Sequence, residues 1–226
     1  MTMMSSAGSW SLALLLGLGA LGAVGCTPGG VGDPCTPEDE YQQTFNGFQV
    51  TETNVESRSF QCETRICLVN HFQGRVSCRL GQGSQLDADN KPNPVGTTYQ
   101  PRCSIPGTKA DPSNNQSLDN INVEVKAQLK DRQTEKAVYC SCRCDGPDKK
   151  ARYCECPDGF ECAKVVEDLK VPGGGGGQLA GSYCIRNGSK YNPNASLVNT
   201  CADDPAACGC SGSKPSAECG VVAAAP

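Results

Sequence analysis

The segment YCSCRCDGPDKKARYCECPDGFEC, residues 139–162, holds six cysteines, at positions 140, 142, 144, 154, 156 and 162. The residues between them are mainly Gly, Pro, Asp, Lys and Arg, with few side chains that can form a hydrophobic core. Such a segment loses more conformational entropy on folding than apolar burial returns. Sulfur must therefore hold it, and the choice between disulfides and bound metal decides the class of fold.

The start of the chain predicts the compartment in which it folds. Residues 11–25, SLALLLGLGALGAVG, are an apolar run that ends in small residues. This run is shorter than the roughly 20 apolar residues of a membrane-spanning helix. It has the pattern of a secretory signal followed by a cleavage site. We therefore predict a signal peptide over residues 1–25.

Cys26 follows the apolar run at once, in the sequence Ala23-Val24-Gly25-Cys26. This sequence resembles the lipobox of bacterial lipoproteins, in which a peptidase cuts before the cysteine and the thiol then carries a diacylglycerol. The resemblance implies that Cys26 is lipidated and that acyl chains such as palmitate anchor the protein to the bacterial outer membrane or cell surface. The alternative is an ordinary signal peptide that releases a periplasmic or secreted protein.

The number of cysteines agrees with lipidation of Cys26. The chain has 17 cysteines, so 17 − 1 = 16 remain. An even number suits a complete set of disulfides, and these bonds persist in oxidising compartments. We expect disulfides at sixteen positions: Cys35, Cys62, Cys67, Cys78, Cys103, Cys140, Cys142, Cys144, Cys154, Cys156, Cys162, Cys184, Cys201, Cys208, Cys210 and Cys219.

Metal binding is the alternative use of the same sulfur atoms. The Cys-x-Cys repeats at 140/142/144, 154/156 and 208/210 are typical of thiolate clusters for soft ions such as Zn²⁺ and Cu⁺. Structural zinc sites favour Cys-x₂₋₄-Cys spacing, which only the pair Cys62 and Cys67 approaches. We therefore predict no metal and no cofactor, and keep a thiolate metal-binding surface protein as the alternative.

Composition and short alternating segments predict the fold class. The chain contains 26 Gly and 15 Pro, which favour turns and loops. We predict a small disulfide-rich, mostly β fold, built from hairpins with long irregular loops. The expected parts are a tether over residues 26–34, a first β-rich disulfide module over 35–110, a second cysteine-dense hairpin module over 111–185 and a cysteine-containing tail over 186–226.

One hairpin is expected in the first module. Its arms are residues 65–71 and 75–79, with the turn at 72–74. In this arrangement Cys67 and Cys78 lie on facing arms and are a candidate disulfide pair.

Two hairpins are expected farther along the chain. Residues 121–129 begin with an alternation of apolar and polar side chains and would pair with residues 136–144. A third hairpin over residues 182–191 would turn at Asn187-Gly188.

Residues 154–162, CECPDGFEC, resemble the C-terminal half of an EGF-like module. The resemblance implies that Gly159 adopts a positive φ in a turn. It also implies that Phe160 covers a small core.

The sequence offers little that predicts catalysis. His71 is the one histidine, and we interpret it as a residue of the hairpin turn. Nucleophile-elbow, zinc-protease and phosphate-loop motifs are missing. A net charge of −4 without a basic block predicts no nucleic-acid partner. We predict that the protein is not an enzyme, and an enzyme with an unpaired cysteine is the third possibility.

As a whole, the signal, Cys26 and the density of cysteines resemble the cysteine-rich surface lipoproteins of Gram-negative bacteria, a class that implies no activity. We predict a lipid-anchored surface protein of the cell envelope with a structural or adhesive role. The expected partners are the membrane, through the anchor, and a protein or glycan ligand. The loop 81–101 and the hairpin tip 71–74 are the predicted contact surfaces.

Overall fold

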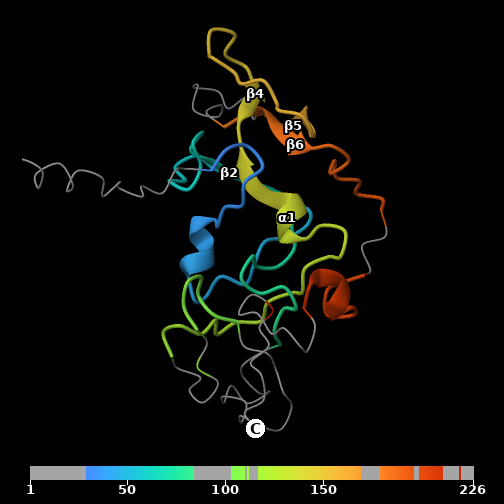
Figure 1. Ribbon diagram of the computed structural model, residues 1–226. Coiled ribbons are helices and arrows are strands. Elements are labelled where there is room, and N and C mark those ends of the chain that lie inside the picture. Colours follow the sequence, from blue (N-terminus) through green and yellow to red (C-terminus); the bar gives the residue numbers. More distant parts are fainter. Residues whose placement is uncertain are drawn as a thin grey trace, which may run out of the picture.

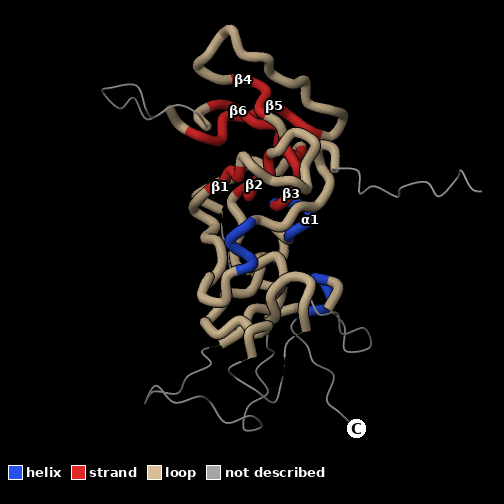
Figure 2. Tube along the Cα trace, turned by 90° about the vertical axis from the view of Figure 1, so that its left-hand side faces the viewer, coloured by secondary structure: helices blue, strands red, loops and turns tan. Residues whose placement is uncertain are grey.

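The computed structural model describes residues 29–83, 103–109, 111, 117–168, 179–195, 199–210 and 219. This part of the chain contains two small antiparallel sheets, little helix and eight disulfides. The predicted class, a small disulfide-rich, mostly β fold with long irregular loops, is confirmed. Figure 2 shows the strands gathered towards one end of the trace and irregular segments towards the other. Within the described ranges, no helix has the length and apolar character needed to cross a membrane.

The first sheet has the strand order β1-β2-β3, with β1 at Thr53–Glu56, β2 at Ile66–Asn70 and β3 at Val138–Ser141. The central strand β2 carries a continuous apolar run, and its residues from Cys67 onward are buried. Such a run is typical of a strand that is covered on both faces. Strands β2 and β3 come from the two predicted modules, 35–110 and 111–185. Those modules therefore share one sheet.

The second sheet has the order β4-β6-β5, with β4 at Arg143–Asp145, β5 at Phe160–Val166 and β6 at Gly181–Arg186. The chain passes directly from β3 to β4, so the two sheets are adjacent in Figure 1. Four buried side chains from both sheets form one hydrophobic cluster: Leu68, Tyr139, Tyr183 and Ile185.

Three short helical turns complete the described structure. The 3₁₀ helix η1 spans Glu38–Tyr41, the α-helix α1 spans Thr134–Ala137, and the 3₁₀ helix η2 spans Pro205–Cys208. Asp204 caps η2 by accepting a hydrogen bond from the Ala207 N–H. Helix η2 therefore begins at a residue suited to start a helix.

The first predicted hairpin is wrong. Strand β2 pairs with β1 and β3, and not with residues 75–79. His71, at φ 50°, follows the end of β2, and Arg75 is completely buried, where its guanidinium bonds backbone carbonyls near η1. The candidate pair Cys67–Cys78 is also wrong, because Cys67 bonds Cys35 and Cys78 bonds Cys103.

The second predicted hairpin is also wrong, although its pattern of burial is right. Ile121 and Val125 are buried and Val123 packs against the same cluster. However, residues 121–129 form only isolated bridges, among them that of Val125 to Gln82. The strand β3 pairs with β2 instead.

The third predicted hairpin is right in its turn and wrong in its partner. Gly188 has φ 75° in a turn directly after β6. Strand β6 pairs with β4 and β5, and not with the residues after the turn.

The segment predicted as a tether is part of the fold from Gly29 onward. The Gly29 N–H donates to the Gln61 carbonyl at 2.7 Å, and the Gly32 N–H donates to the Cys140 carbonyl at 2.8 Å. In return, the Cys140 N–H donates to the Asp33 carbonyl at 2.8 Å. The prediction of a free tether is therefore wrong for residues 29–34, while residues 26–28 lie outside the described ranges.

Candidate functional site

All sixteen cysteines expected to form disulfides are paired in the structure. Cys26 lies outside the described residues. The bonds are Cys35–Cys67, Cys62–Cys140, Cys78–Cys103, Cys142–Cys154, Cys144–Cys162, Cys156–Cys184, Cys201–Cys208 and Cys210–Cys219.

Two of these disulfides touch each other beside β6. The Sγ atom of Cys184 lies 3.5 Å from that of Cys142 and 3.8 Å from that of Cys154, although it is bonded to Cys156. Among the described residues, three groups of three cysteines have Sγ atoms within 4.8 Å of one another: 35/62/140, 142/154/184 and 144/156/184. A cysteine binds a metal ion as its thiolate, so these disulfide-bonded sulfur atoms become ligands only after reduction.

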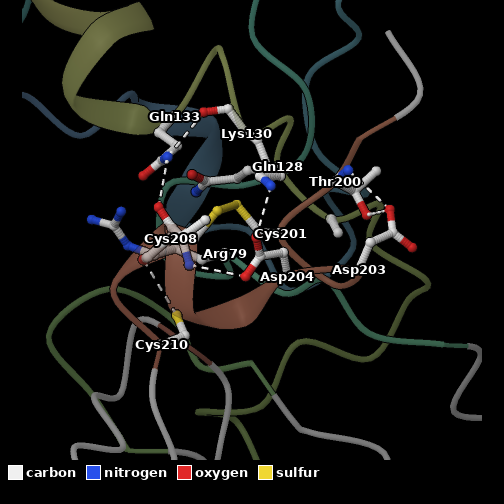
Figure 3. The surroundings of a disulfide bond; sticks show 12 residues. Arg79, Gln128, Lys130, Gln133, Thr200, Cys201, Asp203, Asp204, Cys208 and Cys210 are labelled. Atoms are coloured by element: carbon white, nitrogen blue, oxygen red, sulfur yellow. Dashed lines mark hydrogen bonds and ion pairs between the residues drawn. A yellow bond between two sulfur atoms is a disulfide. The ribbon is translucent and has the colours of Figure 1, made fainter.

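The Cys201–Cys208 disulfide closes a short loop around η2 within the predicted tail, and hydrogen bonds hold this loop against the body of the molecule (Figure 3). The Cys201 N–H donates to the Gln128 carbonyl at 2.8 Å. Lys130 Nζ lies 2.7 Å from an Asp204 carboxylate oxygen, and this hydrogen bond lowers the pKa of Asp204. The Lys130 N–H also donates to the Asn199 carbonyl, and the Gln133 side chain donates to the Ala207 carbonyl. The segment around η2 is thus cross-linked within itself and is held to the body by hydrogen bonds and a partly buried ion pair.

A surface groove of about 680 Å³ lies between the chain around η1 and residues 56–65. We call it the Phe60 groove. It carries two of the large exposed hydrophobic side chains among the described residues, Phe60 at 80% and Tyr41 at 51%. Large exposed aromatic side chains that share one patch indicate an interaction surface.

The loop that carries Phe60 has a constrained backbone. Arg65 adopts φ 63°, a left-handed conformation that is uncommon for a residue other than Gly. Its guanidinium carbon lies 4.5 Å from the centre of the Phe60 ring, in a cation–π contact. The Ser59 N–H donates to the Arg65 carbonyl, and the Arg65 N–H donates to the Cys62 carbonyl. Because Cys62 is bonded to Cys140 in β3, the loop is fixed to the sheet.

The groove also has polar walls. Burial raises the pKa of Glu56, and the nearby carboxylates of Glu38 and Asp39 raise it further. The Glu38 N–H donates to Glu56 at 3.0 Å. The buried Ser59 hydroxyl has no hydrogen-bond partner within the described part of the chain, a situation that costs about 1–3 kcal/mol.

A second pocket of about 460 Å³ lies between residues 131–136 and 186–195. We call it the Tyr191 pocket. Its exposed lysines are Lys136 and Lys190. The Tyr191 ring stacks on His71, with ring centres 4.0 Å apart, and burial lowers the pKa of His71. Figure 1 places the orange chain after β6 and the teal loop before β2 on opposite sides of the sheets.

Arginines in the Tyr191 pocket are mainly structural. Arg132 is buried and donates to the carbonyls of Asn70 and His71 at 2.8 and 2.6 Å. Arg186 donates to the Gly32 carbonyl at 2.7 Å. Beside the exposed Asp131, the two exposed lysines therefore remain as the cations best placed to meet an anionic ligand.

The two contact surfaces predicted from the sequence have different outcomes in the structure. The tip 71–74 is wrong as a contact surface, because Phe72 and Gly74 are buried. In the loop 81–101, Gln82 is buried and its amide donates to the Ile121 carbonyl, while residues 84–101 lie outside the described ranges. The Phe60 groove was missed, and the available signal was a single aromatic residue within the polar sequence Ser59-Phe60-Gln61.

The EGF-like segment is part of a larger sheet. Gly159 has φ 86°, and the Phe160 ring packs edge-on against Tyr139 with centres 5.7 Å apart. However, Cys156 and Cys162 bond Cys184 and Cys144, outside residues 154–162. Comparisons with protein-family models, curated proteins and solved structures found no match for the chain.

Proposed function

We propose that the protein is a lipid-anchored, disulfide-linked module of the bacterial cell surface, with a structural or adhesive role and no catalytic one. The observation that carries the proposal is the pairing of the sixteen cysteines after Cys26 with one another. None of them is available as a partner for Cys26. A cysteine that follows a signal-like segment without an intrachain partner is suited to carry a lipid.

The disulfides also support export. Cytosolic reductants keep thiols reduced, whereas exported proteins retain such bonds. The described core consists of small clusters, several of whose members are half-cystines. Small cores of this kind depend on cross-links for stability.

The anchor is tested by changing Cys26 in the full chain, expressed in a Gram-negative host fed with an alkyne-labelled palmitate. We expect label on the wild type and on the control Thr27→Ser, both in the membrane fraction. Cys26→Ser should carry no label and should appear in the soluble periplasmic or culture fraction. Label that persists in Cys26→Ser, or a wild type without label, would contradict the anchor.

The Tyr191 pocket is the surface that we propose for a protein or glycan ligand. Lys136 and Lys190 offer two exposed ammonium groups there, which suit a ligand with carboxylate groups. We expect the full chain to bind immobilised polygalacturonate, and the double variant Lys136→Ala/Lys190→Ala to bind it at least fivefold more weakly. The control is Lys149→Ala/Lys150→Ala, which removes two exposed lysines elsewhere. Equal binding by the two double variants would remove the pocket from consideration.

A thiolate metal-binding surface protein is the second candidate. It is favoured by the three groups of sulfur atoms within 4.8 Å of one another. With Zn–S bonds of about 2.3 Å, tetrahedral geometry places the ligand sulfurs about 3.8 Å apart, close to the 3.5 and 3.8 Å contacts around Cys184. Thiols that are free in protein purified without reductant would favour this candidate over the disulfide scaffold.

A further inference from the structure

We propose that the Phe60 groove is a membrane-contact surface, which the lipid on Cys26 holds against the bilayer interface. This inference rests on the proposed lipid anchor. It assigns the occupant of the groove as the headgroup region of the membrane, and not a soluble ligand.

The proposed anchor at Cys26 lies only a short distance along the chain from the folded body. Only residues 27 and 28 separate Cys26 from Gly29, so three extended residues span at most about 11 Å. Gly29 is fixed to the body, because its N–H donates to the Gln61 carbonyl at 2.7 Å and its carbonyl accepts from the Glu63 N–H at 2.9 Å. The body therefore cannot stand far from an acyl chain on Cys26.

Phe60 lies beside the point where the chain enters the fold. It directly precedes Gln61, the residue that holds Gly29. Adding the strand-to-strand spacing and one Cα–Cα step places the Phe60 backbone within about 20 Å of the lipidated residue. The groove is thus close enough to the anchor for its exposed face to reach the membrane.

The chemistry of the groove suits the interface of a bilayer. Aromatic rings are enriched where the apolar core of a membrane meets water, and arginine can bury its stem while its charge stays in the headgroups. Phe60 and Tyr41 provide the rings, and the exposed residues Arg58 and Arg65 provide the cations. Arg65 lies against the Phe60 ring, so ring and cation enter the interface together.

The carboxylates of the groove predict how its membrane contact depends on the charge of the lipid headgroups. Glu38 and Glu56 line the same groove and balance the two arginines. Attraction to anionic headgroups should therefore be weak, and burial of the aromatic rings should dominate. We expect contact with zwitterionic phosphatidylethanolamine, with little gain when anionic lipid is added.

Tryptophan fluorescence offers a clean test. The chain has a single tryptophan, Trp10, within the predicted signal, so a tryptophan introduced into the processed protein is its only one. The full lipidated chain is purified as Phe60→Trp and, as a control in the Tyr191 pocket, as Lys190→Trp. Each is reconstituted into phosphatidylethanolamine vesicles, with and without brominated acyl chains, and floated to confirm attachment.

The expected result is a blue shift and at least twofold quenching by brominated lipid for Phe60→Trp, with neither for Lys190→Trp. If both variants float with the vesicles and neither is quenched, the anchor stands and the membrane-contact surface is overturned, which leaves the groove to a soluble ligand. Equal quenching of both variants overturns the assignment of a specific face. Failure of the lipidated chain to float overturns the anchor and, with it, this inference.

Discussion

Cys142 and Cys184 are not bonded to each other, yet their Sγ atoms lie 3.5 Å apart. Both residues are buried, whereas their partners Cys154 and Cys156 are partly accessible. Two disulfides therefore meet at the sulfur atoms of their buried residues, while each has one partly accessible residue. A reductant that opens one bond leaves a thiol in contact with the other.

Partial reduction should therefore produce the non-native bond Cys142–Cys184. A thiolate of an added dithiol attacks Cys154 Sγ and breaks its bond to Cys142, which leaves as a thiolate. That thiolate attacks Cys184 Sγ, breaks the Cys156–Cys184 bond and releases Cys156. We expect peptide mapping after limited reduction and acid alkylation to show Cys142–Cys184 with alkylated Cys156. Alkylated Cys142 together with an intact Cys156–Cys184 bond would contradict this exchange.

The buried pair Glu40–Arg75 should be essential for stability. Both side chains are fully buried, with Arg75 Nε 3.4 Å from a Glu40 carboxylate oxygen. Removing one partner leaves an unpaired buried charge, which costs about 3–5 kcal/mol. We expect Arg75→Met to lower the denaturant midpoint strongly at pH 7, with all disulfides intact. The matched control is Lys149→Met, which removes an exposed pair and should leave the midpoint unchanged; equal midpoints for both variants would refute the prediction.

Gly74 should not tolerate alanine. It has φ 86°, and a Cβ atom there would lie 2.3 Å from the Lys126 carbonyl oxygen. Gly107 has a similar φ of 81° with no atom within 4 Å of such a Cβ, so it isolates the cost of the backbone conformation. We expect Gly107→Ala to lose about 1 kcal/mol and Gly74→Ala clearly more, as measured by the free energy of unfolding. Similar losses would show that the close approach at Gly74 does not matter.

The attachment of the η2 segment should weaken in acid. The hydrogen bond from Lys130 lowers the pKa of Asp204, and bonds from Thr200 lower the pKa of Asp203. A lowered pKa means that the contribution to stability is complete above the ordinary aspartate value of 3.8 and is lost as the pH falls through the folded value.

We therefore expect hydrogen-exchange protection of residues 199–208, corrected for intrinsic rates, to be constant from pH 5 to 7 and to fall below pH 3.8. Asp204→Asn should reduce protection at pH 7, and 1 M salt should have a similar effect because solvent still reaches the partly buried pair. Protection that is unchanged in both conditions would assign the attachment to the hydrogen bonds of Cys201, Lys130 and Gln133 instead of the ion pair.

Sequence patterns were informative where local composition decides the outcome. The lack of apolar residues around the cysteine cluster predicted cross-links, and the alternation at Ile121, Val123 and Val125 predicted which side chains are buried. The turn at Asn187-Gly188 followed from the preference of Gly for positive φ.

Contacts between residues far apart in the sequence could not be predicted from local sequence patterns. Arg75 is a residue type that is usually exposed. It is buried here because carbonyls near η1, 30 or more residues earlier, accept its hydrogen bonds. Disulfide partners likewise depend on the fold, as the long separation of Cys62 and Cys140 shows. The Phe60 groove lies between two segments that hydrogen bonds between Thr36 and Gln61 hold together, a long-range contact that no local pattern predicts.

The most direct test of the lipid-anchored disulfide scaffold is an intact-mass measurement. The protein is purified from its native membrane, denatured without reductant and treated with a thiol alkylator before it is weighed. The predicted result is no alkylation, a lipid-sized mass increase that maps to Cys26, and the eight disulfides described above. One or two alkylated cysteines would contradict the complete pairing and indicate a reactive thiol. Eight or more would contradict the scaffold and make a metal–thiolate cluster the better description.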